Sequence, residues 1–515
     1  MFRGRPRRVG SPISVRVGHA VLGVLAAVVW LMLPGMTSRV DDPVAVTGDG
    51  PVASAAAQEE DDTSAADLVL PLVAGVAAVA VAGYGYVRRT RRARSRTTPG
   101  GAPVRVPGPA PGELDERSVA LLVEADDWVR TSREELSFTE ALSGTDAVAP
   151  WARAVRDAEA ELAAAFHIRR RYDNGVPEDD SSRRHALAGI VGRCEEVGRR
   201  LDAEAAGFDQ LRGLEGGVGE ALGVAETWFR ESAARTGGAD ASLVDLGKRY
   251  GPSAVAGVTG YVEQAKDRLV FATSRLNQSR QSADRGETER AIGSLRAAEG
   301  AVAQAAVLVD GIDRLAVELA AAADLVAPAL TGAEAEIAGA REPRGDVPVG
   351  ELHARIAHAD AALAAVREEV TGGPYDPLGA LRRIVEGVAP LAGGRAGVVG
   401  AAASLVARSA TAAADDCIAT HRGAVGGPAR VLLAEAQRLL GSPVLADLRT
   451  ADTLGRRARD LAEQDVRLHG HPLSGAALGG ILLDGGAPAS FGGPYSRARR
   501  EGDLRTGSAA PPPDR

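Results

Sequence analysis

The sequence predicts an all-α protein: two apolar membrane spans, then a long helical region of antiparallel hairpins or coiled coils, then a disordered tail. Three observations lead to this prediction. Apolar residues recur every three or four positions through residues 113–470. No stretch shows the alternating, valine-rich pattern of a β-strand. Aromatic residues make up only 3% of the chain, so alanine, leucine and valine must form the core, which favours closely packed helices.

Residues 1–37 have the pattern of a signal peptide or a first membrane helix. Several arginines precede an uncharged apolar stretch that runs from Val17 to about Leu33. A basic start followed by an apolar stretch is typical of a secretory signal. The first small-residue cleavage site, Ala55-Ala56-Ala57, lies far beyond this stretch, which favours an uncleaved helix. Both alternatives stay open.

Residues 68–87 form a second apolar span and predict a transmembrane helix. Acidic residues precede the span, and arginines follow it at once. A helix of this length covers about 30 Å, enough to cross the hydrocarbon core of a bilayer. Positive charge stays on the cytoplasmic side. We therefore expect residues 38–67 to form a short extracytoplasmic loop, and the body of the protein to lie in the cytoplasm at the cell membrane.

Residues 88–112 are a basic juxtamembrane segment and a Pro/Gly linker. The linker, residues 97–112, is expected to be extended and semi-rigid. The arginines could contact anionic lipid head groups, each contributing about 1 kcal/mol, or they could only set the topology. These arginines are Arg88, Arg89, Arg91, Arg92, Arg94 and Arg96.

The helical region, residues 113–470, carries apolar seams with the spacing of a left-handed coiled coil. The first seam runs from Leu187 to Leu222, and Glu204 and Glu215 interrupt it. These two glutamates either pair with arginines and set the register or are simply exposed. Glycine and proline pairs predict turns between helices that fold back on each other. The predicted breaks are at residues 174–177, 216–217, 237–238, 251–252, 284–286, 343–348, 372–374 and 426–428.

Glycine, proline and serine return in residues 471–515, which we expect to be a disordered tail. The helical region carries 42 basic and 56 acidic residues, a net charge of −14. Such an acidic region argues against nucleic acid as a partner, because neutralising phosphates requires a basic face.

A search for catalytic, cofactor and metal sites finds none, and the sequence predicts a protein that is not an enzyme. Lys248 follows a glycine but lacks the flanking residues of a P-loop. The pair His353 and His358 is five residues apart, the wrong spacing for a zinc protease, and we expect both to be solvated. Cys194 fits an apolar seam position, and reduced thiols are expected in the cytoplasm. Cys417 is less clear. A metal at His469-Gly470-His471 would be bound weakly, and an ordinary loop is the favoured interpretation.

Several separate segments carry a resemblance to a known family. These are residues 166–180, 200–212, 263–276, 296–310, 372–383 and 420–426. They are similar to the cytoplasmic helical region of actinobacterial TPM-domain membrane proteins. The resemblance implies a signal sequence, an exported TPM domain, one membrane helix and this helical region, usually with a Gly-rich tail. Here the TPM domain is missing, because only a short loop precedes the second span. No TPM-domain activity can therefore be transferred to this chain.

These expectations favour a non-enzymatic interaction scaffold at the cytoplasmic face of the cell membrane, with a protein partner that the sequence does not identify. Residues 373–383, a turn bracketed by prolines, could be a partner-docking corner or an ordinary turn between hairpins. The alternative function is signal relay, in which the outer loop or the membrane helices sense the envelope and act on a cytoplasmic partner.

Overall fold

The computed structural model describes residues 110–342, 348–391, 397–469, 479–483 and 486–507. Within these ranges the regular structure is helical, and one isolated antiparallel bridge joins Leu482 to Pro488. The predicted all-α class is confirmed for this part of the chain. The helices are α3 (Pro111–Ser143), α4 (Thr145–Asn174), α5 (Asp180–Arg212), η2 (Leu214–Gly216), α6 (Gly219–Tyr250), α7 (Pro252–Val255), η3 (Ala256–Val258), α8 (Tyr261–Asp284), α9 (Thr288–Ala340), α10 (Val349–Gly372), α11 (Pro377–Val388), α12 (Gly397–Thr420), α13 (Gly427–Leu439), α14 (Leu445–Leu468) and α16 (Pro494–Gly507).

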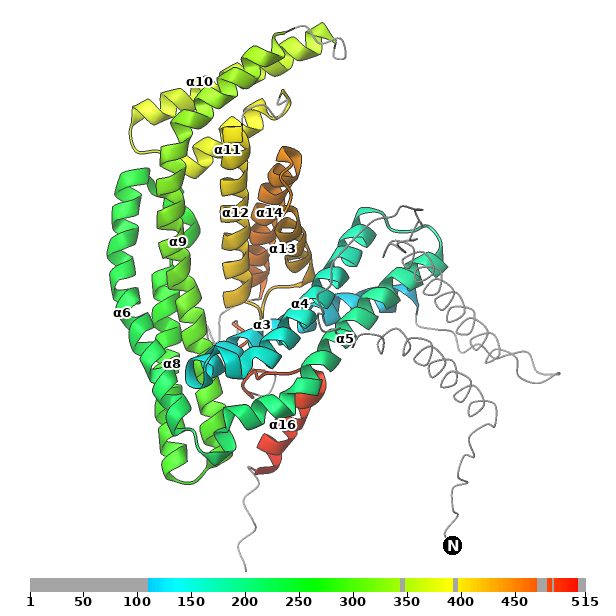
Figure 1. Ribbon diagram of the computed structural model, residues 1–515, viewed down its shortest axis with the longest axis vertical. Helices are drawn as coiled ribbons and strands as arrows, with labels where there is room; N and C mark the ends of the chain where they lie inside the picture. Colours follow the sequence, from blue (N-terminus) through cyan, green and yellow to red (C-terminus); the bar gives the residue numbers. More distant parts are fainter. Residues whose placement is uncertain (1–109, 343–347, 392–396, 470–478, 484–485, 508–515) are drawn as a thin grey trace, which may run out of the picture. The chain divides into compact units, whose positions relative to one another are not determined.

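The 53-residue helix α9 is the element that most others contact (Figure 1). It packs against α6 and α8 on one side and against α11 and α12 on the other. Helices α3, α4 and α5 pack on one another, and α13 and α14 pack against α12. The C-terminal helix α16 contacts α5 and α9, so among the described helices the last returns to an early one.

Local chemistry explains where many of the helices begin and end. The side chain of Asp179 caps α5, because its Oδ1 accepts a hydrogen bond from the backbone N–H of Ser182 at 2.8 Å. The same helix ends where Gly213 adopts a left-handed φ of 62°. Gly251 and Gly286, with φ of 82° and 74°, stand in the turns that follow α6 and α8. The predicted breaks at 251–252 and 284–286 are thus confirmed.

The first half of the predicted seam on α5 is buried. Leu187, Ile190, Cys194, Val197 and Leu201 are all fully inaccessible to solvent. The seam does not continue through Leu222 on one helix, because α5 ends at Arg212 and a 3-10 turn follows. Antiparallel coiled-coil geometry in the strict sense stays a prediction.

The predicted break at Gly237-Gly238 is wrong, because α6 runs without interruption from residue 219 to residue 250. A glycine inside a helix costs up to about 1 kcal/mol relative to alanine. Buried side chains on both sides of the pair, including Thr236, Ala239 and Leu246, hold this stretch of α6 against its neighbours. Tertiary packing therefore outweighs the local preference for a turn.

The prediction of a disordered tail is wrong for most of residues 479–507. Phe491 is fully buried, Ile481 is 2% exposed, and α16 forms near the end of the chain. A Gly/Pro-rich composition indicates disorder only when the segment finds no partner. Here the partner is a surface of α3 and α5, and the contacts span from 291 to 369 residues of sequence.

Two helices of the described part are long and apolar enough to cross a membrane, judged by length and composition alone. They are α9 and α12, and 22% and 50% of their most apolar stretches are buried in the helical unit. Interior helices of soluble proteins have the same composition, so these helices agree only weakly with membrane association. The predicted spans at residues 17–33 and 68–87 lie outside the described residues, as do the loop at 38–67 and the six juxtamembrane arginines.

Helices α12 and α14 approach closely at Gly455. A Cβ at this position would lie 2.9 Å from the backbone nitrogen of Thr411 and 3.0 Å from the carbonyl carbon of Ala410. Backbone atoms cannot move aside as a flexible side chain can. The crossing of α12 and α14 therefore requires a residue without a side chain.

We expect Gly455→Ala to lower the free energy of unfolding by about 1–3 kcal/mol, because the helices must separate. Gly223 in α6 provides the matched control, since a Cβ there would meet nothing within 4 Å. Gly223→Ala should raise the free energy of unfolding by about 0.5–1 kcal/mol. Urea unfolding followed by circular dichroism measures both, and equal effects of the two substitutions would contradict the close crossing.

Candidate functional site

The C-terminal segment, residues 479–483 and 486–507, lies against a surface that we call the docking groove. Phe491 anchors the segment. Its ring stacks on that of Phe208 of α5, with ring centroids 4.1 Å apart and planes inclined by 15°. Trp151 of α4 meets Phe208 edge-on at 6.3 Å. A fully buried aromatic ring is a large share of the apolar area in so short a segment. The docking groove consists of Trp128 and Ser132 of α3 and Gly198, Asp202, Ala205 and Phe208 of α5.

Two glycines let the backbone of the segment approach α5. A Cβ at Gly493 would lie only 2.2 Å from the carbonyl oxygen of Gly198. On the other side, a Cβ at Gly198 would lie 2.7 Å from Cδ of Pro494. Gly492 has a φ of 118°, a conformation that residues with side chains rarely adopt. The contact of Gly198 with Gly493 thus accepts no larger residue on either partner.

Asp202 caps the first turn of α16. Its carboxylate accepts hydrogen bonds from the backbone N–H groups of Gly493, Tyr495 and Ser496 at 3.0, 3.1 and 2.9 Å. The hydroxyl of Ser496 donates to the same carboxylate at 2.6 Å. The first N–H groups of a helix have no partner within the helix, and negative charge is favoured there. A side chain of α5 therefore supplies the cap that α16 lacks in its own sequence.

Arginines complete the attachment of the segment. Arg497 is buried and donates from Nε to the carbonyl of Gly492 at 3.0 Å and from Nη2 to the carbonyl of Trp128 at 3.4 Å. Burial lowers the pKa of Arg497 to about 10. Arg500 forms an ion pair with Asp209 of α5 at 2.5 Å and donates to the hydroxyl of Ser490 at 2.9 Å. The two arginines of the segment therefore face carbonyl and carboxylate groups.

A buried ionic network lies beneath the segment and joins α3, α5, α9 and α16. Arg212 contacts Glu299 and, at 3.0 Å, Glu135. Arg296 contacts Glu135 at 3.0 Å and Asp209 at 3.2 Å. Asp209 also binds Arg500, so positive and negative groups alternate from the core to the segment. The network consists of Glu299, Arg212, Glu135, Arg296, Asp209 and Arg500.

The pKa values of the two glutamates of this network shift in opposite directions. Burial opposes the ionisation of Glu135, but Arg296, Arg212 and Arg500 outweigh it and hold the pKa of its carboxyl below the ordinary value. Burial raises the pKa of Glu299, and the neighbouring Glu135 adds to this shift. Glu135 is thus the carboxylate that holds two arginines together, and Arg212 is the cation that keeps Glu299 in the interior.

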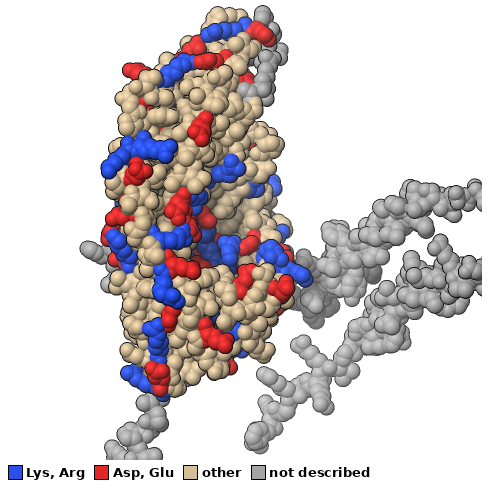
Figure 2. Space-filling view, turned by 60° about the vertical axis from the view of Figure 1, so that its left-hand side comes forward, with Lys and Arg blue, Asp and Glu red and all other residues tan. Residues whose placement is uncertain are grey.

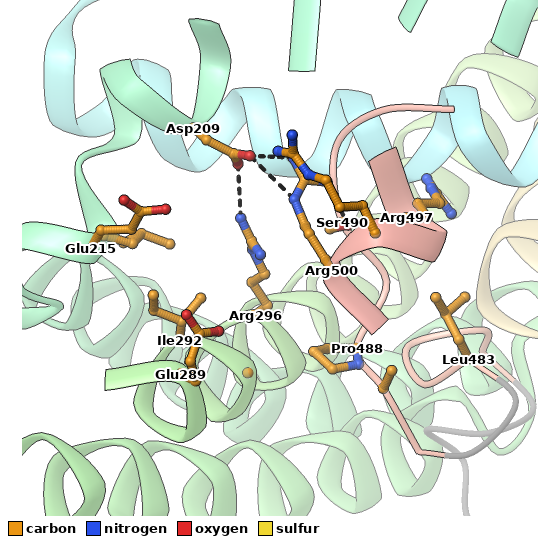
Figure 3. Close-up of a pocket in the computed structure, with 14 residues that line it drawn as sticks. Asp209, Glu215, Glu289, Ile292, Arg296, Leu483, Pro488, Ser490, Arg497 and Arg500 are labelled. Carbon is orange, nitrogen blue, oxygen red and sulfur yellow. Dashed lines mark hydrogen bonds and ion pairs between the residues drawn. The ribbon is translucent and has the colours of Figure 1, made fainter. Parts of the chain in front are cut away.

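A cavity of about 100 Å³ lies between α5, α9 and the C-terminal segment (Figure 3). Figure 3 shows Asp209 directed at Arg296 and Arg500, with Glu215 and Glu289 on another side of the cavity. Small-molecule sites in proteins usually enclose about 300–1,000 Å³. This cavity has room for a few water molecules and is too small for an organic cofactor.

The start of the C-terminal segment is attached separately. The carbonyl of Gly479 accepts hydrogen bonds from Nε2 of Gln304 at 2.6 Å and from Nε of Arg422 at 2.8 Å. Arg422 is 2% exposed and also binds the carboxylate of Glu134 on α3 at 2.6 Å. Helix α9 and the loop before α13 therefore meet at this carbonyl, and Arg422 links the loop to α3.

The structure places both cysteines in buried packing positions. Cys194 is fully buried, and burial raises the pKa of its thiol to about 12. Burial likewise raises the pKa of Cys417 to about 11. Thiols with such pKa values stay protonated at neutral pH and are poor nucleophiles. His353 and His358 are exposed, as predicted for solvated side chains.

In the described part of the chain, no group of three or more His, Cys, Asp or Glu residues could hold a metal ion. His421 is half-buried, and its Nδ1 lies 3.1 Å from the carbonyl oxygen of Cys417. Burial lowers the pKa of His421 to about 4. His469 lies at the end of α14, and residues 470–471 lie outside the described ranges.

The structure brings together residues that the sequence did not single out. Glu215 is exposed and Glu204 is half-buried, and neither has an ion pair among the described residues. Within the predicted seam, residues 187–222, the buried charged residue is instead Arg212. Residues 373–383 turn from α10 into α11 and bury Ala380 and Leu381, so this turn packs in the core. The one sequence signal for the docking groove was Phe491 itself, a large apolar residue in a Gly/Pro-rich stretch.

Asp416 of α12 is a buried carboxylate beside Arg314 of α9. Its side chain is 11% exposed and forms an ion pair with Arg314 of α9. Burial raises the pKa of Asp416 to about 6, with Asp415 and Glu318 adding to the shift against the opposing effect of Arg314. The folded state therefore binds a proton that the unfolded state releases near the ordinary pKa of 3.8.

This shift predicts a pH dependence of stability. The contribution of Asp416 is fully present below about pH 4 and is lost as the pH rises through about 6. The free energy of unfolding of the wild type, relative to that of Asp416→Asn, should fall by about 1–3 kcal/mol between pH 4 and pH 7. Urea unfolding of both proteins across this range measures the difference. A difference that stays constant or rises would contradict the assignment.

Comparison with known proteins finds two curated relatives, which come from two strains of Mycobacterium tuberculosis. They are UPF0603 protein MT2410 from strain CDC 1551 / Oshkosh and UPF0603 protein Rv2345 from strain ATCC 25618 / H37Rv. Each is 30% identical to this chain over 423 residues, which cover 74% of this chain and 63% of the relative. The chain thus spans less than two thirds of the length of these relatives, which suggest an uncharacterised actinobacterial family. No family model and no solved structure matches the chain, and the resemblance to TPM-domain proteins stays a prediction.

Proposed function

We propose that this protein is a membrane-anchored, non-enzymatic interaction scaffold whose helical region offers docking surfaces at the cytoplasmic face of the cell membrane. The docking groove is the observation that carries the proposal. Phe491, Gly493 and Ser496 are bound there by an aromatic stack, a glycine contact and a carboxylate cap. These are the contacts with which a folded protein recognises a peptide segment.

The state of the reactive side chains supports an interaction protein over an enzyme. The pKa values of the thiols of Cys194 and Cys417 are raised, which is the opposite of the shift that activates a nucleophile. The buried carboxylate Glu135 and the half-buried carboxylate Asp209 are each held by two arginines. These ion pairs join helices to one another.

The charge distribution supports a protein partner over nucleic acid. Figure 2 shows one face of the molecule, on which positive and negative side chains are interspersed. A nucleic-acid-binding face concentrates lysine and arginine along one stripe or groove. Mixed charge of this kind suits the polar rim of a protein–protein contact.

Photo-crosslinking in cells tests the scaffold. A photoreactive residue is placed at Val270 of α8 or at Val317 of α9, which are 71% and 70% exposed and lie outside the docking groove. A scaffold should give one or a few recurrent adducts from such positions, and the same adducts should form in every growth condition. Adducts that change with envelope stress would favour signal relay instead. No discrete adduct from either position, with the protein at its normal level, would count against both functions.

Membrane contact through the arginines Arg88 to Arg96 is a further part of the proposal. A chain that begins at Arg88 should float with anionic vesicles at low salt and be released at high salt, because exposed charges are screened within about 8 Å at physiological ionic strength. Serine at positions 91, 92, 94 and 96 should abolish flotation and leave helicity unchanged. If the wild-type chain ignores anionic vesicles even at low salt, the cluster only sets topology.

A further inference from the structure

We infer that the docking groove is a binding site for segments of the sequence Phe-Gly-Gly-Pro-x-Ser-Arg, and that its ligand in trans is the C-terminal segment of a second copy of this chain. The inference rests on the proposed function and names the partner of one of its surfaces. In the structure, the groove is occupied by the chain's own residues 491–497.

The groove and its occupant are far apart in the sequence, so their contact does not depend on local chain connection. Gly493 and Asp202 are separated by 291 residues, and Arg497 and Trp128 by 369 residues. The covalent route from α14 to the segment is short, since nine residues lie between His469 and Gly479. This length spans at most about 35 Å. The contacts themselves are the same whether the segment belongs to the same chain or to a neighbour.

Each position of the motif is recognised by a different contact. The Phe ring stacks on Phe208, and the second glycine is required by the 2.2 Å approach to the carbonyl of Gly198. Asp202 requires free N–H groups after the proline and a hydroxyl at the serine position. The arginine position donates to the carbonyl of Trp128. The groove therefore recognises both the backbone conformation and the side chains of the motif.

The chain contains an internal comparison for this specificity. The sequence Gly-Gly-Pro-Tyr occurs twice, at residues 372–375 and at residues 492–495. At the first site Thr371 stands in the place of the phenylalanine, and Asp376 stands in the place of the serine. An aspartate there would face the carboxylate of Asp202, and like charges disfavour binding. The motif at 372–375 should thus be rejected.

A second copy of this chain is the partner that the structure supports, because it carries the sequence that fits the groove. Exchange of an identical element between copies re-forms every contact and is a low-cost route to association. The cis segment competes at an effective concentration that short linkers set in the millimolar range. Proteins held side by side in a membrane are the setting in which a neighbour can compete.

Two full-length variants separate the groove from its ligand. Gly493→Ala places a Cβ against the backbone of Gly198, so this chain has an intact groove and a segment that cannot dock. Asp202→Lys puts a positive charge at the N-terminus of α16, so this chain has a defective groove and an intact segment. Tyr495→Ala, at a side chain that is 74% exposed, is the matched control within the segment.

The first readout is the binding of a fluorescent peptide of residues 486–507 to each full-length chain, measured by anisotropy. The Gly493→Ala chain should bind at least about tenfold more tightly than the wild type or Tyr495→Ala, whose grooves are filled in cis. Adding Asp202→Lys to the Gly493→Ala chain should abolish binding. A peptide with Phe491→Ala should not bind.

The second readout is mixing. The Gly493→Ala and Asp202→Lys chains, each with a different fluorophore, should associate when mixed, and neither should self-associate through this contact.

If the Gly493→Ala chain keeps its helicity but does not bind the peptide, the inference is wrong. It is equally wrong if this chain unfolds, because the segment is then an inseparable part of the fold. If the peptide binds but the mixed chains stay apart, the second copy is excluded as the partner. Crosslinks from Val270 and Val317 report on the scaffold independently of all these outcomes.

Discussion

Replacing Arg212 with methionine is expected to lower the free energy of unfolding of the helical unit by about 3–5 kcal/mol. Arg212 has a side chain that is 2% exposed, and it contacts Glu135 and Glu299, which are 6% and 3% exposed. Removing the cation leaves Glu299 buried without its partner, whereas Glu135 keeps Arg296. Chemical unfolding monitored by circular dichroism measures the effect.

Two further variants identify the origin of that loss. Arg117→Met removes an arginine from the exposed pair with Glu195, and such surface pairs are worth at most about 1 kcal/mol. Adding Glu299→Leu to Arg212→Met should restore part of the stability, because the uncompensated buried charge is gone. A double variant that is less stable than Arg212→Met alone would contradict the role given to buried charge.

Replacing Phe491 with alanine is expected to release the C-terminal segment while the rest of the helical unit stays folded. Truncating a buried phenylalanine to alanine costs about 3–5 kcal/mol. Since about 1.4 kcal/mol corresponds to a factor of ten in an equilibrium constant, the amides of α16 should exchange with solvent at least about 100-fold faster. Hydrogen exchange followed by mass spectrometry resolves this segment from α5 and α9.

The control for Phe491→Ala is Tyr495→Ala, which should change exchange rates little because this ring is exposed. Peptides from α10 and α11, which do not contact the segment, should exchange at wild-type rates in both variants. Faster exchange throughout the chain in Phe491→Ala would mean that the segment supports the whole fold. Unchanged exchange in α16 would mean that Phe491 does not hold it.

The parts of the fold that local pattern controls could be predicted from the sequence. The spacing of Leu187, Ile190 and Val197 predicts one apolar face of a helix, and that face is buried. Glycine with a positive φ, as at Gly251 and Gly286, marks turns because other residues avoid this conformation. Such signals depend on neighbours within one or two turns of the chain.

The contact between the docking groove and the C-terminal segment could not be predicted. Neither the sequence of the segment nor that of the groove residues indicates the contact by itself. The Gly/Pro-rich composition around Phe491 is typical of disorder, and its order comes from Phe208 and Asp202 on a distant helix. Arg212 shows the same limit, since nothing near it in the sequence distinguishes it from the many exposed arginines. Its burial follows from Glu135 and Glu299, which arrive from α3 and α9.

The separation of Asp202 from its partners in α16 has a consequence for biosynthesis. A ribosome must add 291 residues after Asp202 before it reaches Gly493. At about 5–20 residues per second this takes roughly 15–60 s. During that interval α5 is complete while Phe208 lacks the ring that covers it and Asp202 lacks the amides that it caps. Every nascent chain thus exposes an empty docking groove before its own C-terminal segment is made, and a finished neighbouring chain has the first opportunity to fill it.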